Sequence, residues 1–281
     1  MTTRRPVRAA GRVRSTPLVL KLGGELLEQP TDLARMAAGI AALASRAPVV
    51  VVHGGGKEID AALALASIPK RQVDGLRITD APTLEVVVSV LAGAINTKLV
   101  SAVRQAGGRP VGLTGADAGV VVARRSAPIT SVAGERVDLG LVGTPVPGSK
   151  PELLTTLLRA GYTPVVACVG ATSTGALLNV NADTLASHLA AALGARRLII
   201  AGGTSGVLDA SGNTIPQLTM RDATRLIASG VANKGMVAKL DACRSAIKRG
   251  VGDVLIANGR TVVFDALLGR NQAAACTQVV R

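Results

Sequence analysis

Two glycine clusters that follow apolar stretches are the first candidates for chemistry in this chain. One apolar run ends in Lys21-Leu-Gly23-Gly24, and a second, Pro48 to His53, ends in Gly54-Gly55-Gly56. Glycines let backbone N–H groups approach a ligand without a Cβ in the way, and a helix that begins near Lys57 would add amides that favour an anion. The same residues could equally form a tight strand-to-helix turn without a ligand, and for one isolated cluster that simpler interpretation is preferable.

The segments around these clusters predict a parallel β-sheet. The four valines at 49–52 indicate a strand buried on both faces, because β-branched side chains fit a pleated surface and no polar alternation marks a solvent side. A helical stripe over 30–46 connects the strand at 17–21 to this one, which makes a βαβ unit. Parallel strands connected in this way place both glycine clusters at the same carboxyl edge of the sheet.

The rest of the chain continues the alternation of strands and helices. We expect helices over 57–66, 82–105, 150–160, 182–193, 219–228 and 235–249. Strands are expected over 111–113, 162–169 and 197–201, with a last core strand over 253–257. Glycines, prolines and alternating valines within 120–148 predict hairpins beside the main sheet. The pattern is that of an α/β protein, without an internal repeat or a long linker.

Composition excludes some classes of function. The chain has 281 residues and a formal net charge of +14, which attracts polyanions nonspecifically and equally attracts nucleotides, acidic metabolites or an acidic partner protein. Tyr162 and Phe264 are the only aromatic residues, so the stacking surfaces typical of single-stranded nucleic-acid binding are missing. No apolar run approaches the roughly 20 residues of a membrane-spanning helix. We therefore expect a soluble, cytoplasmic protein without a membrane or specific nucleic-acid partner.

The first sixteen residues form a basic extension. Five of the arginines lie there (Arg4, Arg5, Arg8, Arg12 and Arg14), and removing their charge leaves 14 − 5 = +9. The segment lacks the apolar region of a secretory signal, although its composition faintly resembles an organellar transit peptide. We expect a disordered tail, with an oligomerisation arm as the alternative.

Cysteine and histidine patterns predict no metal site. Cys168, Cys243 and Cys276 are far apart and lack a C-x-x-C spacing, so they are interpreted as small apolar residues in a reducing compartment. His53 ends an apolar strand and His188 lies within a helix, where hydrogen-bonded structural roles are more common than metal binding. The chain also contains no complete P-loop, dinucleotide-binding or nucleophile-elbow motif.

Five motifs at loop positions resemble, in their order, the acetylglutamate kinases of the amino acid kinase family. They are Lys21-Leu-Gly-Gly, His53-Gly-Gly-Gly, Gly75-Leu-Arg77, Asn179-Val-Asn-Ala-Asp183 and Gly235-Met-Val-Ala-Lys239, and the resemblance extends from about Leu18 to Arg260. It implies a three-layer αβα sandwich with a central, mainly parallel sheet. It also implies one kinase domain over 17–281, with an acceptor-binding and dimerisation lobe at 17–178 and a nucleotide-binding lobe at 179–281.

The resemblance assigns roles to matching residues. Lys21 and Lys239 would stabilise the phosphoryl group during transfer, with Asp183 holding both lysines. Gly55, Gly56, Arg77 and Asn179 would bind N-acetyl-L-glutamate, with Arg77 on its α-carboxylate. ATP, with Mg²⁺ as cofactor, would contact a longer set: Gly23, Gly24, Gly203, Thr204, Ser205, Gly206, Val207, Leu208, Val231, Ala232 and Asn233.

Two departures affect the nucleotide site. Gly203 stands where members of the family usually carry an acid, and Lys234 stands where they usually carry a small or acidic residue before Gly-Met. The segment 273–280 lacks the acidic, glycine-rich pattern of arginine-inhibited relatives, so we expect no strong arginine feedback.

The function that the resemblance implies is ATP-dependent phosphorylation of N-acetyl-L-glutamate in arginine biosynthesis, by a homo-oligomer. One alternative is a related kinase for carrier-bound or N-acylated aminoadipate or glutamate, in lysine or ornithine biosynthesis, although Gly75-Leu-Arg77 argues against it. Another alternative is a binding or regulatory homologue with weakened catalysis, suggested by Gly203. Nucleic-acid binding through net charge alone has the least support.

Overall fold

The computed structural model describes residues 16–149, 151–230, 234–261, 264–269 and 276–281. Residues 1–15 of the basic extension and the ATP-contact residues predicted at 231–233 lie outside these ranges. Within them, the centre of the molecule is an eight-stranded sheet in the order β14-β16-β15-β13-β1-β2-β10-β5. Its strands are β1 (Leu18–Leu22), β2 (Val49–His53), β5 (Pro110–Thr114), β10 (Thr163–Ala167), β13 (Arg197–Gly202), β14 (Gln217–Thr219), β15 (Asp253–Asn258) and β16 (Cys276–Val280).

Strand β1 lies at the middle of the sheet, where the two halves of the chain meet. It pairs in parallel with β2 on one side and with β13 on the other. The strands β2, β10 and β5 belong to the first part of the chain, whereas β13, β15, β16 and β14 belong to the second. The carboxyl ends of β1, β2 and β13 therefore bring turns from both halves to one edge.

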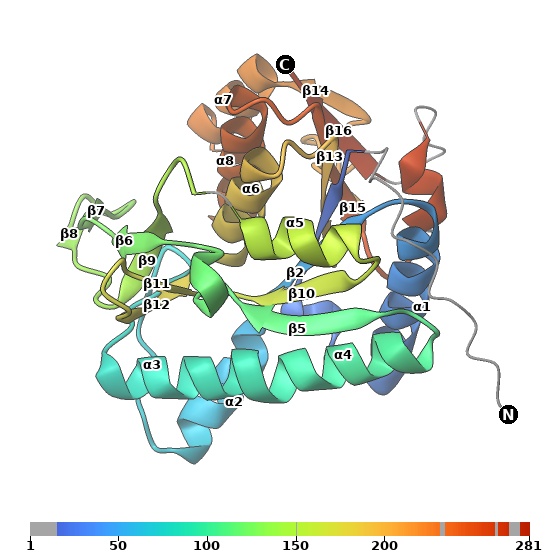
Figure 1. The fold of residues 1–281 in the computed structure, drawn as a ribbon. Coiled ribbons are helices and arrows are strands. Elements are labelled where there is room, and N and C mark those ends of the chain that lie inside the picture. The colour runs from blue at the N-terminus through green and yellow to red at the C-terminus, as the bar shows by residue number, and fades with distance from the viewer. Residues whose placement is uncertain (1–15, 150, 231–233, 262–263, 270–275) are drawn as a thin grey trace, which may run out of the picture.

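Helices cover both faces of the sheet, so the molecule has three layers (Figure 1). The first group consists of α1 (Pro30–Arg46), α2 (Gly56–Leu65), α3 (Ala81–Val88) and α4 (Asn96–Gln105), and α4 packs on β5 and β10. The opposite face carries α5 (Glu152–Arg159), α6 (Ala182–Ala192) and α8 (Lys234–Lys248), and α7 (Met220–Ala228) packs against α8. The predicted α/β sandwich with a mainly parallel sheet is confirmed.

A smaller four-stranded sheet stands beside the main sheet (Figure 1), in the order β11-β12-β9-β6. Its strands are β6 (Ala123–Arg125), β9 (Val142–Pro145), β11 (Val169–Ala171) and β12 (Leu177–Val180). Two short hairpins complete the β-structure: β3 (Gln72–Val73) with β4 (Leu76–Arg77), and β7 (Ile129–Thr130) with β8 (Arg136–Val137). The hairpins predicted within 120–148 are thus present.

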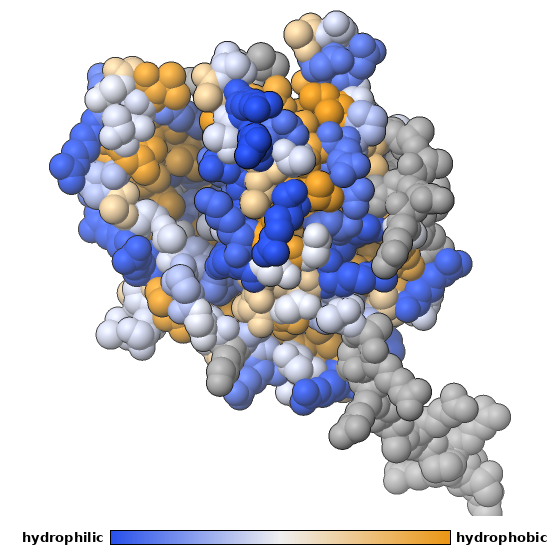
Figure 2. All heavy atoms as spheres, turned by 90° about the horizontal axis from the view of Figure 1, so that it is seen from above, coloured by the Kyte–Doolittle hydropathy of each residue, from blue (hydrophilic) through white to orange (hydrophobic). Residues whose placement is uncertain are grey.

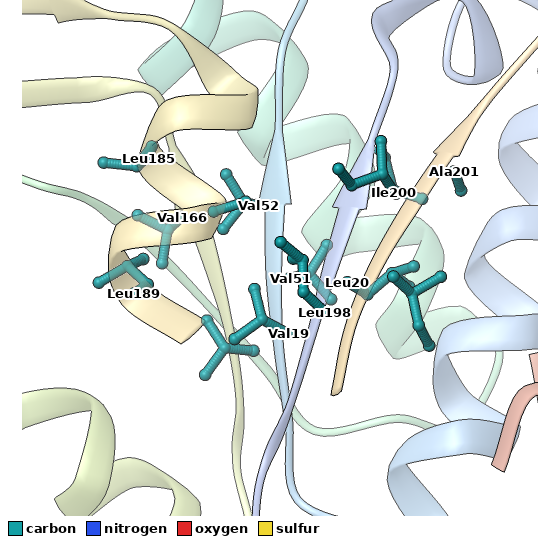
Figure 3. Packing of buried hydrophobic residues seen from close by; sticks show 14 of the residues in the cluster. Val19, Leu20, Val51, Val52, Val166, Leu185, Leu189, Leu198, Ile200 and Ala201 are labelled. Atoms are coloured by element: carbon teal, nitrogen blue, oxygen red, sulfur yellow. The ribbon is translucent and has the colours of Figure 1, made fainter. Parts of the chain in front are cut away.

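The core is aliphatic, and its side chains alternate between the faces of the central strands. Strands β1 and β2 are buried along their whole length, as the valine run predicted. Figure 3 shows Leu185 and Leu189 of α6 beside Val52 and Val166, the residues that bring this helix onto the sheet. On the surface, Figure 2 shows hydrophobic patches separated by hydrophilic side chains.

The helix expected over 82–105 is continuous, but it contains a π-helical segment, η2 (Ser89–Ile95), between α3 and α4. By length and composition alone, residues Ala81–Gln105 could span a membrane, contrary to the expectation from the sequence. Val87, Leu91 and Leu99 are instead buried within the protein core. The apolar side of this helix therefore packs against protein.

Two strand predictions were wrong in detail. The strand expected over 162–169 ends at Ala167, and Val169 begins β11 in the smaller sheet. The strand over 253–257 is not the last core strand, because β16 pairs antiparallel with β15 and lies between it and β14. The short strand β14 was also missed, since three residues carry too little pattern to be recognised.

Candidate active site

A buried ion pair lies at the centre of the carboxyl edge. Lys21 of β1 is in register with Val52 of β2, so its side chain points to the face that α6 covers. The Lys21 Nζ atom lies 2.9 Å from Asp183 Oδ1, and each side chain is only 8% exposed. Asp183 is in the first turn of α6, where the N-cap residue Asn181 accepts hydrogen bonds from the amides of Asp183 and Thr184. The prediction that Lys21 and Asp183 come together is matched by this geometry.

Lys21 stays positively charged in this pair. Burial by itself lowers the pKa of Lys21, but attraction to Asp183 outweighs it, and the net pKa is above the ordinary value of 10.5. The Nζ atom lies within hydrogen-bonding distance of Asp183 Oδ1, and a side-chain hydrogen bond with Asp183 also helps to raise this pKa. The carboxylate holds the ammonium group in place.

Two glycine turns meet beside this pair. A Cβ added at Gly24 would lie 2.8 Å from the Cα atom of Gly55, which is closer than real Cβ contacts. A Cβ added at Gly55 would lie 2.0 Å from Cδ1 of Ile95, in the π-helical segment. Only glycine allows the turns after β1 and β2 to approach each other and the helix in this way. The short helix η1 (Gly24–Leu26) and α2 both begin at these turns, so their first amides face the edge.

A cavity of about 200 Å³ opens next to the glycine turn after β2. Its lining includes Gly55, Gly56, Arg77, Asn179 and Ala182. Larger hollows of about 390 Å³ exist on the molecule, but their linings lack this combination of glycine turn, arginine and helix start. The cavity thus brings together the four residues predicted to bind the acceptor.

Arg77 lines this cavity, and one of its nitrogens has no hydrogen-bonding partner. Its Nη2 atom donates to Asp60 Oδ1 at 2.5 Å and to Gly56 O at 3.2 Å, whereas Nη1 is buried without a hydrogen-bonding partner. The Asn179 amide donates to Thr79 Oγ1 at 3.1 Å, which fixes its orientation. A buried guanidinium N–H without a partner is costly, and a carboxylate of a ligand would satisfy it.

The second half of the chain supplies the other side of the edge. The turn after β13 contains Gly203, whose N–H donates to the Glu25 carboxylate at 3.0 Å. Thr204 is exposed, and Gly206 and Val207 are buried. The Val207 N–H donates to Thr277 Oγ1 of β16 at 2.8 Å, so the last strand anchors this loop. Glu25 was missed by sequence reasoning, although a carboxylate directly after the first glycine pair was a signal.

Lys239 lies on α8 and does not join the ion pair. Its Nζ atom donates to Gly235 O at 3.4 Å, within its own helix, and its Cε atom lies 3.9 Å from where a Cβ on Gly202 would be. Lys239 is thus at the β13 side of the edge, and Lys21 is at the centre. The contact between Asp183 and both lysines that the resemblance implied is present for Lys21 alone among these described residues.

The histidines have structural environments. His53 is fully buried, Asn96 Nδ2 lies 3.0 Å from its Nε2, and its Nδ1 lies 3.2 Å from Gly54 O. Burial lowers the pKa of His53 to about 4, so the ring is neutral at physiological pH. Among the residues with described positions, no group of three or more His, Cys, Asp or Glu side chains could hold a metal ion.

Sequence comparison assigns this arrangement to a family. The model of the amino acid kinase family matches residues 16–258. The chain belongs to the amino acid kinase family. Within it, the chain is similar to acetylglutamate kinases: 41% identical to that of Rhodopseudomonas palustris strain BisA53, covering 87% of this chain and 83% of the relative. It is 44% identical to that of Sorangium cellulosum, with 84% of each chain covered.

Solved structures agree on the amino acid kinase fold. The N-acetylglutamate synthase from Neisseria gonorrhoeae, complexed with coenzyme A and N-acetyl-glutamate, aligns with a TM-score of 0.80 at 24% identity. That alignment covers 97% of this chain but only 61% of the length of the solved chain. Carbamate kinase from Giardia lamblia bound to AMP-PNP aligns with a TM-score of 0.67 at 16% identity, covering 96% and 99% of the two chains. At these identities the likeness shows the fold alone.

Proposed function

We propose that the chain transfers the γ-phosphoryl group of ATP to the γ-carboxylate of N-acetyl-L-glutamate, a step of arginine biosynthesis. The observation that carries the proposal is the place of the Lys21–Asp183 pair beside a cavity that is lined by Arg77, whose Nη1 atom is buried without a hydrogen-bonding partner. The relatives named acetylglutamate kinase support the same reaction. The carrier-linked aminoadipate alternative is not favoured by these relatives.

The acceptor would be held by the first half of the chain. Arg77 would bind the α-carboxylate through Nη1, and Asn179 would contribute its side-chain amide to the same ligand. The γ-carboxylate would then lie over Gly55 and Gly56, at the edge where the amides of α2 point. Because a free glutamate carboxyl has a pKa of about 4.3, this nucleophile is already ionised at neutral pH. No general base is needed, and the site must instead reduce the repulsion between two anions.

In the transfer step, a γ-carboxylate oxygen forms a bond to the γ-phosphorus while the bond from that phosphorus to the β,γ-bridging oxygen breaks. ADP leaves with the electron pair, and the product is N-acetyl-L-glutamyl 5-phosphate. Negative charge is spread over the phosphoryl oxygens, so positioning and charge neutralisation supply most of the catalysis. Lys21 would neutralise this charge from the centre of the edge, with Asp183 keeping its ammonium in place. Lys239 would act from the β13 side.

The residues at this edge fit a magnesium ion that is shared with nucleotide phosphates. Mg²⁺ is usually held by one or two carboxylates plus phosphate oxygens and water, and the edge offers carboxylates but no complete protein site in the described residues. When bound, the ion neutralises charge between the β- and γ-phosphates. Gly24 and the remaining amides of the 203–208 turn would contribute N–H groups around the same phosphates. The N–H of Gly23 donates instead to Ala201 O, and those of Gly203 and Val207 donate to Glu25 and Thr277.

Assembly and location belong to the same proposal. We assign a homo-oligomer formed through the first half of the chain, because β5 is an end strand of the main sheet and lines a hollow of about 350 Å³ together with the helix that packs on it. Light scattering coupled to size exclusion tests this assignment, and a strictly monomeric enzyme would contradict it. Cys168 and Cys243 are buried thiols outside any disulfide, which supports a cytoplasmic location.

The activity is tested by trapping the acyl phosphate with hydroxylamine. The purified chain is supplied with ATP, Mg²⁺ and one of three acceptors: N-acetyl-L-glutamate, free glutamate or a carrier-bound aminoadipate. We expect hydroxamate with acetylglutamate and a much lower yield with the other two. Absence of hydroxamate with acetylglutamate would overturn the proposed function, and a preference for the carrier-bound acceptor would favour the related kinase.

A further inference from the structure

Glu25 places a carboxylate between two turns of the edge. It follows the first glycine pair and lies in η1, and its Oε1 atom accepts a hydrogen bond from the N–H of Gly203 at 3.0 Å. A Cβ added at Gly23 would lie 2.4 Å from Glu25 Oε2, so the carboxylate also covers the turn after β1. Because β1 and β13 are paired in parallel, both turns leave the same edge of the sheet. The carboxylate therefore stands among amides suited to phosphate oxygens.

This carboxylate has no cation of its own, in contrast to its neighbours. Asp183 is paired with Lys21, Asp32 with Arg260, and Glu28 with Lys57. For Glu25, none of the ion pairs formed between described residues includes it, although its charge is felt at Lys21. Arg260 donates to the backbone oxygen of Glu25 at 2.9 Å rather than to its side chain. The backbone is thus held, while the carboxylate accepts the Gly203 N–H and forms no ion pair, although its charge contributes, after that of Asp32, to the raised pKa of Arg260.

A carboxylate without an ion pair here would oppose a triphosphate unless a cation lies between them. Two anions at contact distance repel, whereas a hard divalent ion accepts oxygen ligands from both. With such an ion in place, the Glu25 carboxylate would bind the metal instead of repelling the phosphates. The arrangement would favour the metal-bound nucleotide over the free one.

We propose that Glu25 is the carboxylate that faces the Mg²⁺ of the bound nucleotide and makes nucleotide binding depend on the metal. The proposal rests on the proposed function, because it takes a magnesium nucleotide as the ligand of this edge. Gly203, on the turn after β13, faces the Glu25 side chain. A Cβ at Gly203 would lie 3.8 Å from Glu25 Cγ and 3.8 Å from Oε1, so a side chain at 203 would reach the space that Glu25 occupies.

The test measures nucleotide affinity without catalysis. Isothermal titration with AMP-PNP, in Mg²⁺ and in EDTA, gives the factor by which the metal strengthens binding. Glu25→Gln keeps an oxygen that accepts from Gly203 but removes the charge. We expect this factor to fall by roughly tenfold, with affinity in EDTA unchanged or higher. Glu135→Gln, at an exposed position between β7 and β8, is the matched control and should leave the factor unchanged.

A second variant separates a metal contact from a structural role. Glu25→Gln/Gly203→Asp returns a carboxylate to the same space from the opposite turn, and it should restore at least part of the metal dependence. An unchanged factor in Glu25→Gln would overturn the proposal, as would an equal gain of affinity with and without Mg²⁺, which would mark Glu25 as a simple competitor of phosphate. If Glu25→Gln lowers the factor but the wild type yields no hydroxamate from acetylglutamate, the proposed function fails and the role of Glu25 stands.

Discussion

The Lys21–Asp183 pair is difficult to explain as a stabilising feature. Both side chains are almost fully buried, and taking two charges out of water costs several kcal/mol per ion. Attraction to Asp183 favours the charged form of Lys21, but two apolar side chains of similar volume could fill this space without that cost. A cation held at this cost, at the edge where phosphate-binding amides converge, is explained by the charge of the transferring phosphoryl group.

Lys21→Ala separates the catalytic and structural contributions of the pair. We expect kcat to fall by on the order of 10²–10³, the usual effect of removing one group that stabilises developing charge. Unfolding free energy should also fall by about 3–5 kcal/mol, because Asp183 is left as an uncompensated buried charge. Hydroxamate assays and urea denaturation measure the two effects.

The double variant Lys21→Met/Asp183→Asn is the control for stability. Removing both charges should recover most of the lost unfolding free energy without recovering the rate. If the double variant regained activity together with stability, Lys21 would have only a structural role.

Arg77→Lys tests whether the guanidinium binds the acceptor. Lysine keeps the positive charge but has a single side-chain nitrogen. It therefore cannot bind Asp60 and a ligand carboxylate through two coplanar nitrogens, as arginine can. We expect KM for acetylglutamate to rise roughly tenfold to a hundredfold, with a much smaller change in KM for ATP. Arg71→Lys, an exposed arginine in the same loop, is the control. Equal effects on both substrates would contradict the assignment.

At the scale of elements, regular strands were predictable and irregular features were not. The valines of β2 are buried on both faces, so the apolar run alone was enough to predict this strand. The π-helical segment has no such signal, because its seven residues continue the apolar pattern of α3. Strand β16 was missed for a different reason: its pairing with β14 and β15 depends on residues about 20 to 60 positions away.

The π-helical segment delivers Asn96 to a buried position behind the glycine turn. The Asn96 amide group donates to Val165 O at 2.9 Å and lies 3.0 Å from His53 Nε2. Asn96→Ala would leave two buried acceptors without donors, each worth about 1–3 kcal/mol. We expect unfolding free energy to fall by roughly 2–5 kcal/mol, measured by urea denaturation. Thr97→Ala, at the exposed neighbouring position, should change it by less than about 0.5 kcal/mol.

Strand β16 connects the end of the described chain to the nucleotide loop. Thr277 is fully buried, and its hydroxyl accepts from Val207 N–H and donates to Ile215 O at 2.7 Å. Thr277→Val keeps the shape and removes both bonds, so the loop at 203–208 should become less ordered. We expect weaker AMP-PNP binding, by roughly tenfold, with KM for acetylglutamate little changed. Thr277→Ser, which keeps the hydroxyl, should bind nucleotide like the wild type.

At the scale of the whole molecule, the sequence predicted the fold class but not the order of the strands. Placing β13 beside β1 depends on contacts between the two halves of the chain, which local periodicity does not record. The same limit applies to the site. Lys21, Asp183 and Arg77 could be assigned through motifs, whereas the contact between Glu25 and Gly203 spans 178 positions and follows from the strand order.

The buried histidines make the stability of the molecule sensitive to acid. His53 lies against Asn96 at the start of α4 and His188 lies within α6, on opposite faces of the sheet, and burial lowers the pKa of each from 6.5 to about 4. In the unfolded chain both rings bind protons near pH 6.5, while in the folded chain they remain neutral until about pH 4. Stability is therefore fully present above pH 6.5 and is lost as the pH falls from there to about 4, because the unfolded state binds more protons.

The size and the pH range of this loss of unfolding free energy distinguish the histidines from the carboxyl groups. For His53 alone the shift corresponds to about 3 kcal/mol, and half of the window lies above about pH 5, where ordinary carboxyl groups remain ionised. We expect urea denaturation at pH 7.5, 6 and 5 to show a steady decrease in unfolding free energy. In the His53→Asn variant the unfolding free energy should depend less on pH, by up to one bound proton. At pH 7.5 this variant should be less stable than the wild type. A wild-type unfolding free energy that stays constant from pH 7.5 to 5 would contradict this prediction. It would mean that the rings are hydrated or paired with an acid in the folded protein, because a neutral buried imidazole resists protonation.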